Sequence, residues 1–122
     1  MDLTLFFNPV DEAIYSSVSS ISSFYKNIRI YADKMPSYKD AHIALLGVPE
    51  ERGTGIVKGT ANAADEIRRK LYPLKKGHGS YRIVDLGNLK PGHDLDETYV
   101  RLSEVCRMLL EDNVLPVILG GS

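Results

Sequence analysis

The sequence is poor in several features that would point to particular classes of protein. Its 122 residues contain one cysteine, Cys106, so an internal disulfide is excluded and a reducing compartment is favoured. The formal net charge is −1, which gives no reason to expect nucleic acid or an anionic membrane as a partner. No apolar run approaches the roughly 20 residues that span a bilayer. The N-terminal stretch 1–7 lacks the basic residues of a secretory signal, so we expect a cytoplasmic protein.

Residues 1–40 are expected to form a helical extension followed by a linker. Asn8 can cap a helix and Pro9 suits the first helical position. An apolar stripe then recurs at steps of three and four residues, at Ile14, Val18, Ile21 and Tyr25. The opposite face is rich in serine, a mediocre helix former, so low-complexity disorder is the alternative interpretation. The linker is predicted at residues 31–40, around a Met-Pro-Ser turn.

From residue 41 to residue 122 the pattern alternates between short apolar runs and amphipathic stretches. It predicts strands at 42–48, 81–86 and 114–119, and helices at 62–72 and from Asp94 onward. The apolar faces of the two helices are expected at Ala64, Ile67 and Leu71, and at Leu95, Tyr99, Leu102, Cys106 and Leu109. Strands and helices that alternate at this spacing imply right-handed crossovers and a parallel sheet, so residues 41–122 are expected to form an α/β domain.

The loops at 49–59, 87–93 and 120–122 follow the carboxyl ends of these predicted strands. They should lie on one edge of the sheet, where open α/β sheets bind ligands. The run 114–119 is typical of an inner strand, and the chain ends just after it, so we expect the domain to be cut at the edge of its own site. A sheet that stops at an inner strand leaves backbone donors and apolar faces unpaired, so we expect self-association into a homo-oligomer.

The first of these loops is rich in glycine and charge. The stretch 53–60 follows a strand and precedes a helix, but its spacing fits neither a dinucleotide fingerprint nor a Walker loop, in which the lysine follows the glycine. A loop whose glycines allow close backbone approach, or one that faces substrate, fits better. Glu50, Glu51 and Arg52 could be an ordinary solvated charge run, yet their place at the strand ends makes a role in a site more plausible than for a random triplet.

The remaining reactive side chains show no pattern of known chemistry. His42, His78 and His93 lack the spacing of metal ligands and are predicted to lie on the surface. Cys106 lies on the apolar stripe of a helix, where a small buried hydrophobic side chain is a better interpretation than a nucleophile.

Three segments together resemble the N-terminal part of the ureohydrolase superfamily of arginase, agmatinase and formimidoylglutamase. The first begins with Gly47-Val48-Pro49 and continues to the Ile67-Arg68 of the following helix. The second is Asp85-Leu86-Gly87-Asn88, which is similar to the family's Asp-x-Gly-Asp strand end. The third runs from Val117 to Ser122 and is similar to the strand before the family's Gly-Gly-x-His, whose histidine is the first manganese ligand. Among the families, formimidoylglutamase-like bacterial members are the most similar.

The resemblance implies a three-layer α/β/α fold and a two-manganese site that hydrolyses a guanidino or formimino C–N bond. In such a site the metals bind hydroxide and lower the pKa of its parent water. This chain stops before the ligand histidine and the later aspartate motifs, so none of the family's metal ligands can be assigned to it. Asn88 also stands where the family has aspartate, which removes a negative charge near the site.

The leading hypothesis is therefore an N-terminal scaffold of a binuclear-manganese amidine hydrolase that is inactive by itself. A small amidine or guanidine would be the substrate of the whole enzyme, and the groups expected near it are Glu51, Arg52, Asn88 and Ser122. The alternative is a degenerate, non-catalytic superfamily member that binds a ligand or a partner subunit. A stand-alone nucleotide-binding module is a third possibility, which the glycine spacing disfavours.

Overall fold

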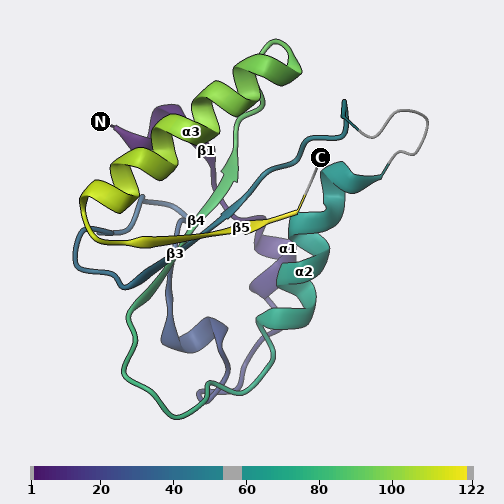
Figure 1. The fold of residues 1–122 in the computed structure, drawn as a ribbon. Coiled ribbons are helices and arrows are strands. Elements are labelled where there is room, and N and C mark those ends of the chain that lie inside the picture. Colours follow the sequence, from purple (N-terminus) through teal and green to yellow (C-terminus); the bar gives the residue numbers. More distant parts are fainter. Residues whose placement is uncertain (1, 54–58, 121–122) are drawn as a thin grey trace.

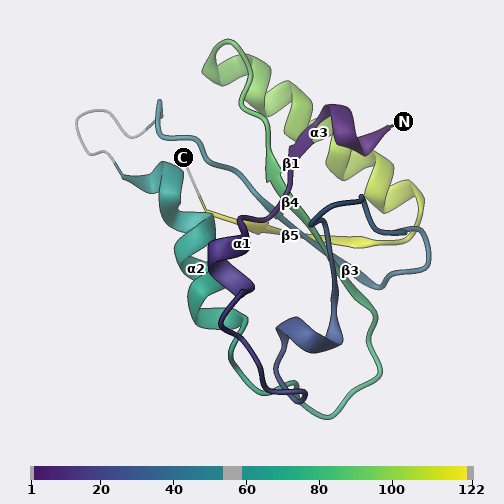
Figure 2. The ribbon, with the colours of Figure 1, turned by 180° about the vertical axis from the view of Figure 1, so that it is seen from behind.

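The computed structural model of the protein describes residues 2–53 and 59–120, which build one mixed sheet with helices on both faces (Figure 1, Figure 2). In the described residues the sheet has the order β1-β4-β3-β5, and β2 also pairs with β4. The strands are β1 (Phe7–Asn8), β2 (Arg29–Ile30), β3 (Ile43–Gly47), β4 (Ile83–Leu89) and β5 (Leu115–Leu119). Only β1 is antiparallel to its neighbour; β2, β3 and β5 run parallel to theirs.

The helices form two outer layers around this sheet. They are α1 (Glu12–Tyr15), α2 (Ala63–Leu71) and α3 (Leu95–Glu111), with short 3-10 turns at Leu3–Leu5, Tyr25–Asn27 and Thr60–Asn62. Figure 1 shows α3 along one side of the sheet and α1 and α2 on the other. Side chains of α3 share the main core with alternate strand residues: Val105, Leu109, Ala44, Leu46, Val84 and Leu86. Because strand side chains alternate between faces, Asp85 points to the opposite face, where it meets Arg68 of α2. The expected three-layer α/β/α fold is confirmed.

The connections place the carboxyl ends of three strands together, as predicted. The chain passes from β3 through α2 to β4, and then through α3 to β5 on the other side of β3. The last residue of β3, Gly47, pairs with Leu119 of β5 and with Asn88 of β4. In an open α/β sheet the place where successive connections diverge is where ligands bind, and here it lies between β3 and β5.

The long helix predicted near the N-terminus is wrong. Its proposed cap, Asn8, lies in β1 and pairs with Asn88, while the helix that does form is one turn capped by the Asp11 carboxylate. The serine-rich part that follows makes local hydrogen bonds instead, such as the one from the Ser22 amide to the Ser20 hydroxyl. Such bonds compete with helix formation. The segment contributes β1 and β2 to the sheet, and the division of the chain at residue 40 stays a prediction.

In the rest of the chain α2, α3 and β3 form where expected, but several buried faces differ. The Asp94 side chain caps α3 at the Glu97 amide, as predicted. In α2, however, Arg68 is fully buried while Ile67 is 40% exposed. In α3 the buried residues are Thr98, Val105 and the predicted Leu109, whereas Cys106, expected to be buried, is only partly so. No helix among the described residues is long and apolar enough to cross a membrane.

β4 and β5 also depart from the predicted strands. The strand predicted at 81–86 begins later and continues through Gly87, whose φ of 87° suits glycine and where a Cβ would meet the Asn8 carbonyl oxygen at 2.1 Å. The close approach of β1 therefore requires glycine at this position. β5, predicted to be an inner strand, pairs in the described structure with β3 only, and its Leu115, Val117 and Ile118 are at least 36% exposed.

Candidate functional site

The carboxyl edge of the sheet is organised around the side chain of Glu50, three residues after the end of β3. This side chain is only 3% exposed. Its carboxylate accepts hydrogen bonds from the backbone amides of Glu51 and Arg52, at 3.0 and 2.9 Å. The Thr98 hydroxyl in the first turn of α3 donates a third, at 2.9 Å. Glu50 therefore folds its own loop back and fastens it to a helix 48 residues further along the chain.

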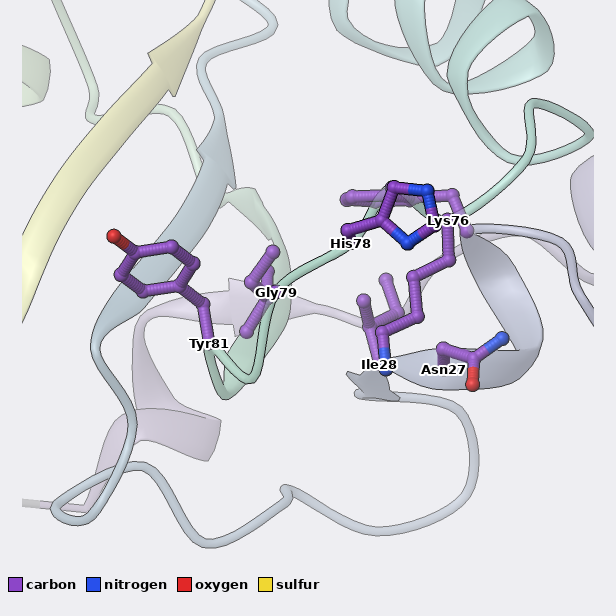
Figure 3. A pocket seen from close by; sticks show the side chains of 9 residues that line it. Asn27, Ile28, Lys76, His78, Gly79 and Tyr81 are labelled. Carbon is purple, nitrogen blue, oxygen red and sulfur yellow. The ribbon is translucent and has the colours of Figure 1, made fainter.

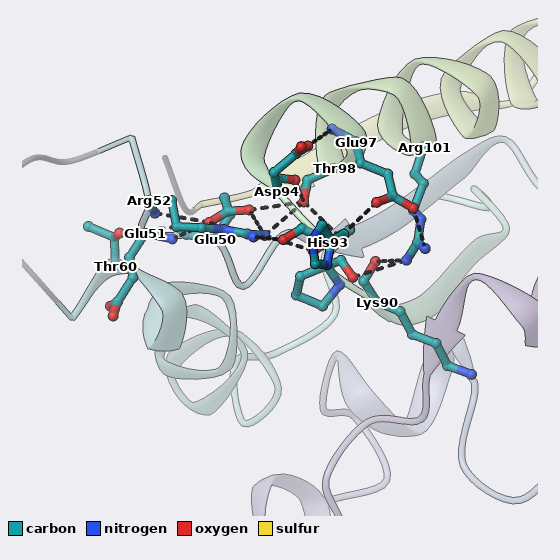
Figure 4. A network of polar contacts seen from close by, with 12 residues as sticks. Glu50, Glu51, Arg52, Thr60, Lys90, His93, Asp94, Glu97, Thr98 and Arg101 are labelled. Carbon is teal, nitrogen blue, oxygen red and sulfur yellow. Dashed lines mark hydrogen bonds and ion pairs between the residues drawn. The ribbon is translucent and has the colours of Figure 1, made fainter.

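Arg52 completes this arrangement, which we call the edge clamp: Glu50, Arg52 and Thr98 (Figure 4). Its guanidinium binds both carboxylate oxygens of Glu50, at 2.8 and 2.6 Å. The same group donates to the carbonyl oxygens of Gly92 and His93, at 3.0 and 2.9 Å. The clamp thus joins the loop after β3 to the loop after β4, and it commits the guanidinium of Arg52 to protein groups.

The clamp also fixes the charge state of Glu50. Hydrogen bonds from Arg52 are the main reason that the pKa of Glu50 is lowered, to about 2, although burial acts in the opposite direction. The pKa of Arg52 is raised, mainly by its hydrogen bonds to the same carboxylate. Glu50 is therefore an anion near neutral pH and is unsuited to act as a general base, whose pKa should lie near the working pH.

Glu51 lies at the stem of the glycine-rich loop. Its carboxylate accepts a hydrogen bond from the Gly59 amide at 2.9 Å, and the Thr60 hydroxyl donates to the Glu50 carbonyl at 3.2 Å. These two bonds hold the ends of the loop together. Residues 54–58, the middle of the glycine-rich stretch, lie outside the described residues, and so does the predicted site residue Ser122.

Asn88, the remaining predicted site residue, belongs to a second cluster that sequence reasoning did not identify. Its amide oxygen accepts a hydrogen bond from Arg68, and its amide nitrogen donates to Asp65 at 3.1 Å. The amide packs directly against β3, because a Cβ on Gly47 would meet its oxygen at 2.0 Å. Asn88 is therefore tied to α2 and β3 beneath the strand ends.

The centre of that second cluster, which we call the buried pair, is Arg68 with Asp85. Both side chains have zero exposed area. The guanidinium contacts the two carboxylate oxygens of Asp85 at 2.9 Å each, and also donates to the Gly87 carbonyl. The Tyr72 hydroxyl donates to the same carboxylate at 2.5 Å. Burial lowers the pKa of Arg68, but the negative charge of the groups around it, Asp85 first, raises it, and the net shift is upward. For Tyr72, burial and then Asp85 both raise the pKa.

The described residues do not fit a manganese site. No group of three or more His, Cys, Asp or Glu side chains within 2–53 and 59–120 is placed to hold a metal ion. Two carboxylates of this region are already held by arginine, Glu50 in the loop after β3 by Arg52 and Asp85 of β4 by Arg68. The three histidines are exposed, as predicted, and the Asp94 carboxylate caps α3. Hard divalent ions need several such ligands brought together.

Comparisons with known proteins agree with this architecture. The model of the Arginase family matches residues 41–122, from just before β3 to the end of the chain. A formimidoylglutamase from Citrobacter koseri is 35% identical over 83 residues, which cover 65% of this chain and 26% of that protein.

The fold is also similar to a crystal structure of Trypanosoma cruzi formiminoglutamase with Mn2+. The TM-score is 0.63 at 20% sequence identity, over 75% of this chain and 33% of that one. The chain thus spans about a quarter to a third of the length of these relatives. The matched region holds all three strands whose carboxyl ends form the candidate site, and the chain belongs to the arginase family.

Proposed function

We propose that this chain forms the N-terminal part of the catalytic domain of a formimidoylglutamase-type hydrolase, an enzyme that cleaves a formimino or guanidino C–N bond. The observation that carries the proposal is the family match over residues 41–122, together with the convergence of β3, β4 and β5 at one edge. The 35% identity to a formimidoylglutamase favours a formimino compound over arginine or agmatine as substrate.

Within such an enzyme the described residues would shape the site. The edge clamp would hold the loops after β3 and β4 in a fixed relation, because Arg52 bonds to both. Arg52 and Asn88 would act as positioning residues, since their polar groups are committed to Glu50 and to Arg68. Glu51 and Ser122 remain candidates for groups next to the substrate.

Two manganese ions would supply Lewis-acid activation of the attacking water in this kind of reaction. Their ligands would have to come from outside the described residues, in which no suitable group exists. By itself the chain is thus proposed to be inactive. A cytoplasmic location and self-association through the exposed residues of β5 are further parts of the proposal, and nucleic acid is not an expected partner.

The experiment compares the 122-residue chain with the complete product of its gene. Each is purified, its manganese is measured by elemental analysis, and the release of formamide or urea is followed with formiminoglutamate, arginine and agmatine. We expect manganese-dependent formamide release from the complete product and none from the chain alone. Stoichiometric manganese with turnover in the chain alone would overturn the assigned location of the ligands. Tight substrate binding without turnover in the complete product would instead identify the degenerate, non-catalytic alternative.

A further inference from the structure

A small apolar cavity lies at the end of the sheet opposite to the candidate site. Its volume is about 160 Å³, and its walls include Phe24, Ile28, Gly77 and Ile83 (Figure 3). Ile28 precedes β2 and Ile83 begins β4, so the cavity lies at the amino ends of these strands. The edge clamp belongs to the carboxyl ends, and the cavity is therefore separate from the site described above.

The size of the cavity matches one aromatic ring. An enclosed apolar protein cavity of about 150 Å³ is large enough to bind benzene. The volume of the present cavity is slightly larger, and apolar atoms dominate its walls. A ring that enters would gain the free energy of burying apolar surface, about 25 cal/mol per Å².

Cationic side chains line this cavity and the depression next to it. The cavity opens beside this second, wider depression of about 360 Å³, which shares Ile28, Lys76 and Ile83 with it. The cationic side chains that line the two are Lys26, Arg29, Lys76 and Arg82. Neither lining includes an aspartate or glutamate among the described residues.

Of these cations, Lys76 is the best placed to bind an anion. Arg29 is held by the Asp40 carboxylate at 2.7 Å, and Arg82 lies 3.9 Å from the same group. The Lys26 ammonium lies 5.6 Å from the centre of the Tyr25 ring. Lys76 lines both the apolar cavity and the cationic depression, and Figure 3 shows it close to His78 and Ile28.

From this arrangement we infer that the cavity is a binding site for a small aromatic carboxylate, with the ring between Phe24, Ile28 and Ile83 and the carboxylate at Lys76. The apolar cavity selects the ring, and the cation at its mouth selects the anion. A ligand that has only one of these two parts binds more weakly. The inference does not depend on the proposed function, because no residue of the edge clamp takes part.

Phenylacetate is a suitable probe for the 122-residue chain, with acetate and benzyl alcohol as controls that carry only the charge or only the ring. NMR titration should shift the amide signals of Ile28, Gly77 and Ile83 with phenylacetate far more than with acetate. Lys76→Met keeps the aliphatic stem and should weaken phenylacetate about three- to fivefold, the range of an exposed ion pair, with no effect on benzyl alcohol. Lys34→Met removes the same charge from an exposed position outside the cavity. It should change the binding of neither phenylacetate nor benzyl alcohol.

A second variant tests the cavity itself. A Cβ added at Gly77, which lines the cavity, meets no atom within 4 Å, so Gly77→Leu should leave the fold intact and reduce the space for the ring. This variant should weaken the binding of phenylacetate and of benzyl alcohol to the same extent. Equal shifts with acetate and phenylacetate, shifts centred elsewhere on the protein, or equal effects of Lys76→Met and Lys34→Met would each overturn the assignment.

Discussion

The edge clamp and the buried pair use the same chemistry in different surroundings. Each joins an arginine to a carboxylate through two hydrogen bonds and adds a hydroxyl group, Thr98 in one and Tyr72 in the other. They differ in contact with water. Both side chains of the buried pair are inaccessible to water. In the ion pair of the clamp, the Glu50 carboxylate is buried but Arg52 is 39% exposed.

This difference separates a group that holds the fold from one that holds a loop. Removing one member of the buried pair would leave an uncompensated charge inside the protein between α2 and β4. Water can reach Arg52 and can replace part of what Arg52 contributes. We therefore expect substitutions in the buried pair to change global stability, and substitutions in the clamp to change mainly the geometry of the strand-end loops.

The largest effect is expected from Arg68→Met. The substitution keeps much of the side-chain volume but leaves Asp85 buried without its cation, so the free energy of unfolding should fall by about 3–5 kcal/mol. Urea unfolding followed by circular dichroism measures this change. The neighbouring Arg69→Met is the matched control, because Arg69 is 44% exposed and forms an ion pair with Glu66, at 3.5 Å. A similar loss of unfolding free energy in Arg68→Met and Arg69→Met would contradict the idea that burial sets the size of the effect.

The buried pair also marks the limit of what local sequence patterns predict. Periodicity placed α2, β3 and the Asp94 cap of α3 correctly, because each depends on residues that are neighbours along the chain. Arg68 was not among the residues expected on the buried face of its helix, since its partner Asp85 lies 17 residues away. The segments that hold these two residues were recognised as a family resemblance, although their contact was not.

The same reason applies to the candidate site. Glu50 and Arg52 looked like an ordinary charge run because the groups that organise them lie more than 40 residues further on, in Thr98 and the loop after β4. The predicted N-terminal helix failed for a related cause. Phe7 and Asn8 pair with β4, and no periodicity within the first 25 residues reveals a partner at 88–89.

A smaller loss of stability is expected from Tyr72→Phe. The hydroxyl of this fully buried tyrosine donates to a charged acceptor, Asp85, at 2.5 Å. Its removal should lower the free energy of unfolding by about 1.5–3 kcal/mol, the range for a hydrogen bond to a charged group. Tyr81→Phe, at a side chain that is 67% exposed, should have no measurable effect in the same urea experiment. Equal stability of Tyr72→Phe and the parent protein would contradict the assigned role of the hydroxyl.

Glu50→Gln should reduce stability less, and in a pH-dependent manner. The pKa of Glu50 is about 2 in the folded chain, against an ordinary value of 4.5, so its carboxylate stabilises the fold fully above about pH 4.5. That contribution is lost as the pH falls from 4.5 towards 2, because the carboxyl group then takes up a proton in the folded state too. With Arg52 partly in water, we expect a difference of about 1 kcal/mol at pH 7.

The measurement is a set of urea midpoints between pH 2 and pH 7 for the parent and for Glu50→Gln. The two curves should converge towards pH 2, separate as the pH rises from 2 to 4.5, and keep a constant difference above pH 4.5. Glu66→Gln serves as the control, because Glu66 is 67% exposed and its loss removes the same charge without disturbing the clamp. Curves that stay parallel across this range would mean that the Glu50 carboxylate is not held by Arg52 in solution.

The smallest effect on stability, and the most specific effect on the loops, is expected from Arg52→Lys. Lysine keeps the positive charge, but its single ammonium cannot bind the Glu50 carboxylate through two nitrogens and also reach the carbonyl groups of Gly92 and His93. The urea midpoint should stay within experimental error of the parent value, while amide hydrogen exchange at Gly59 and Gly92 should become faster as the two loops separate. The comparison variant is Arg101→Lys. Arg101 donates hydrogen bonds to the carbonyl oxygen of Lys90 and to Glu97 on the neighbouring turn of α3. If Arg52→Lys lowered global stability as much as Arg68→Met while leaving exchange at Gly59 and Gly92 unchanged, the clamp would be part of the fold rather than a tether for the site.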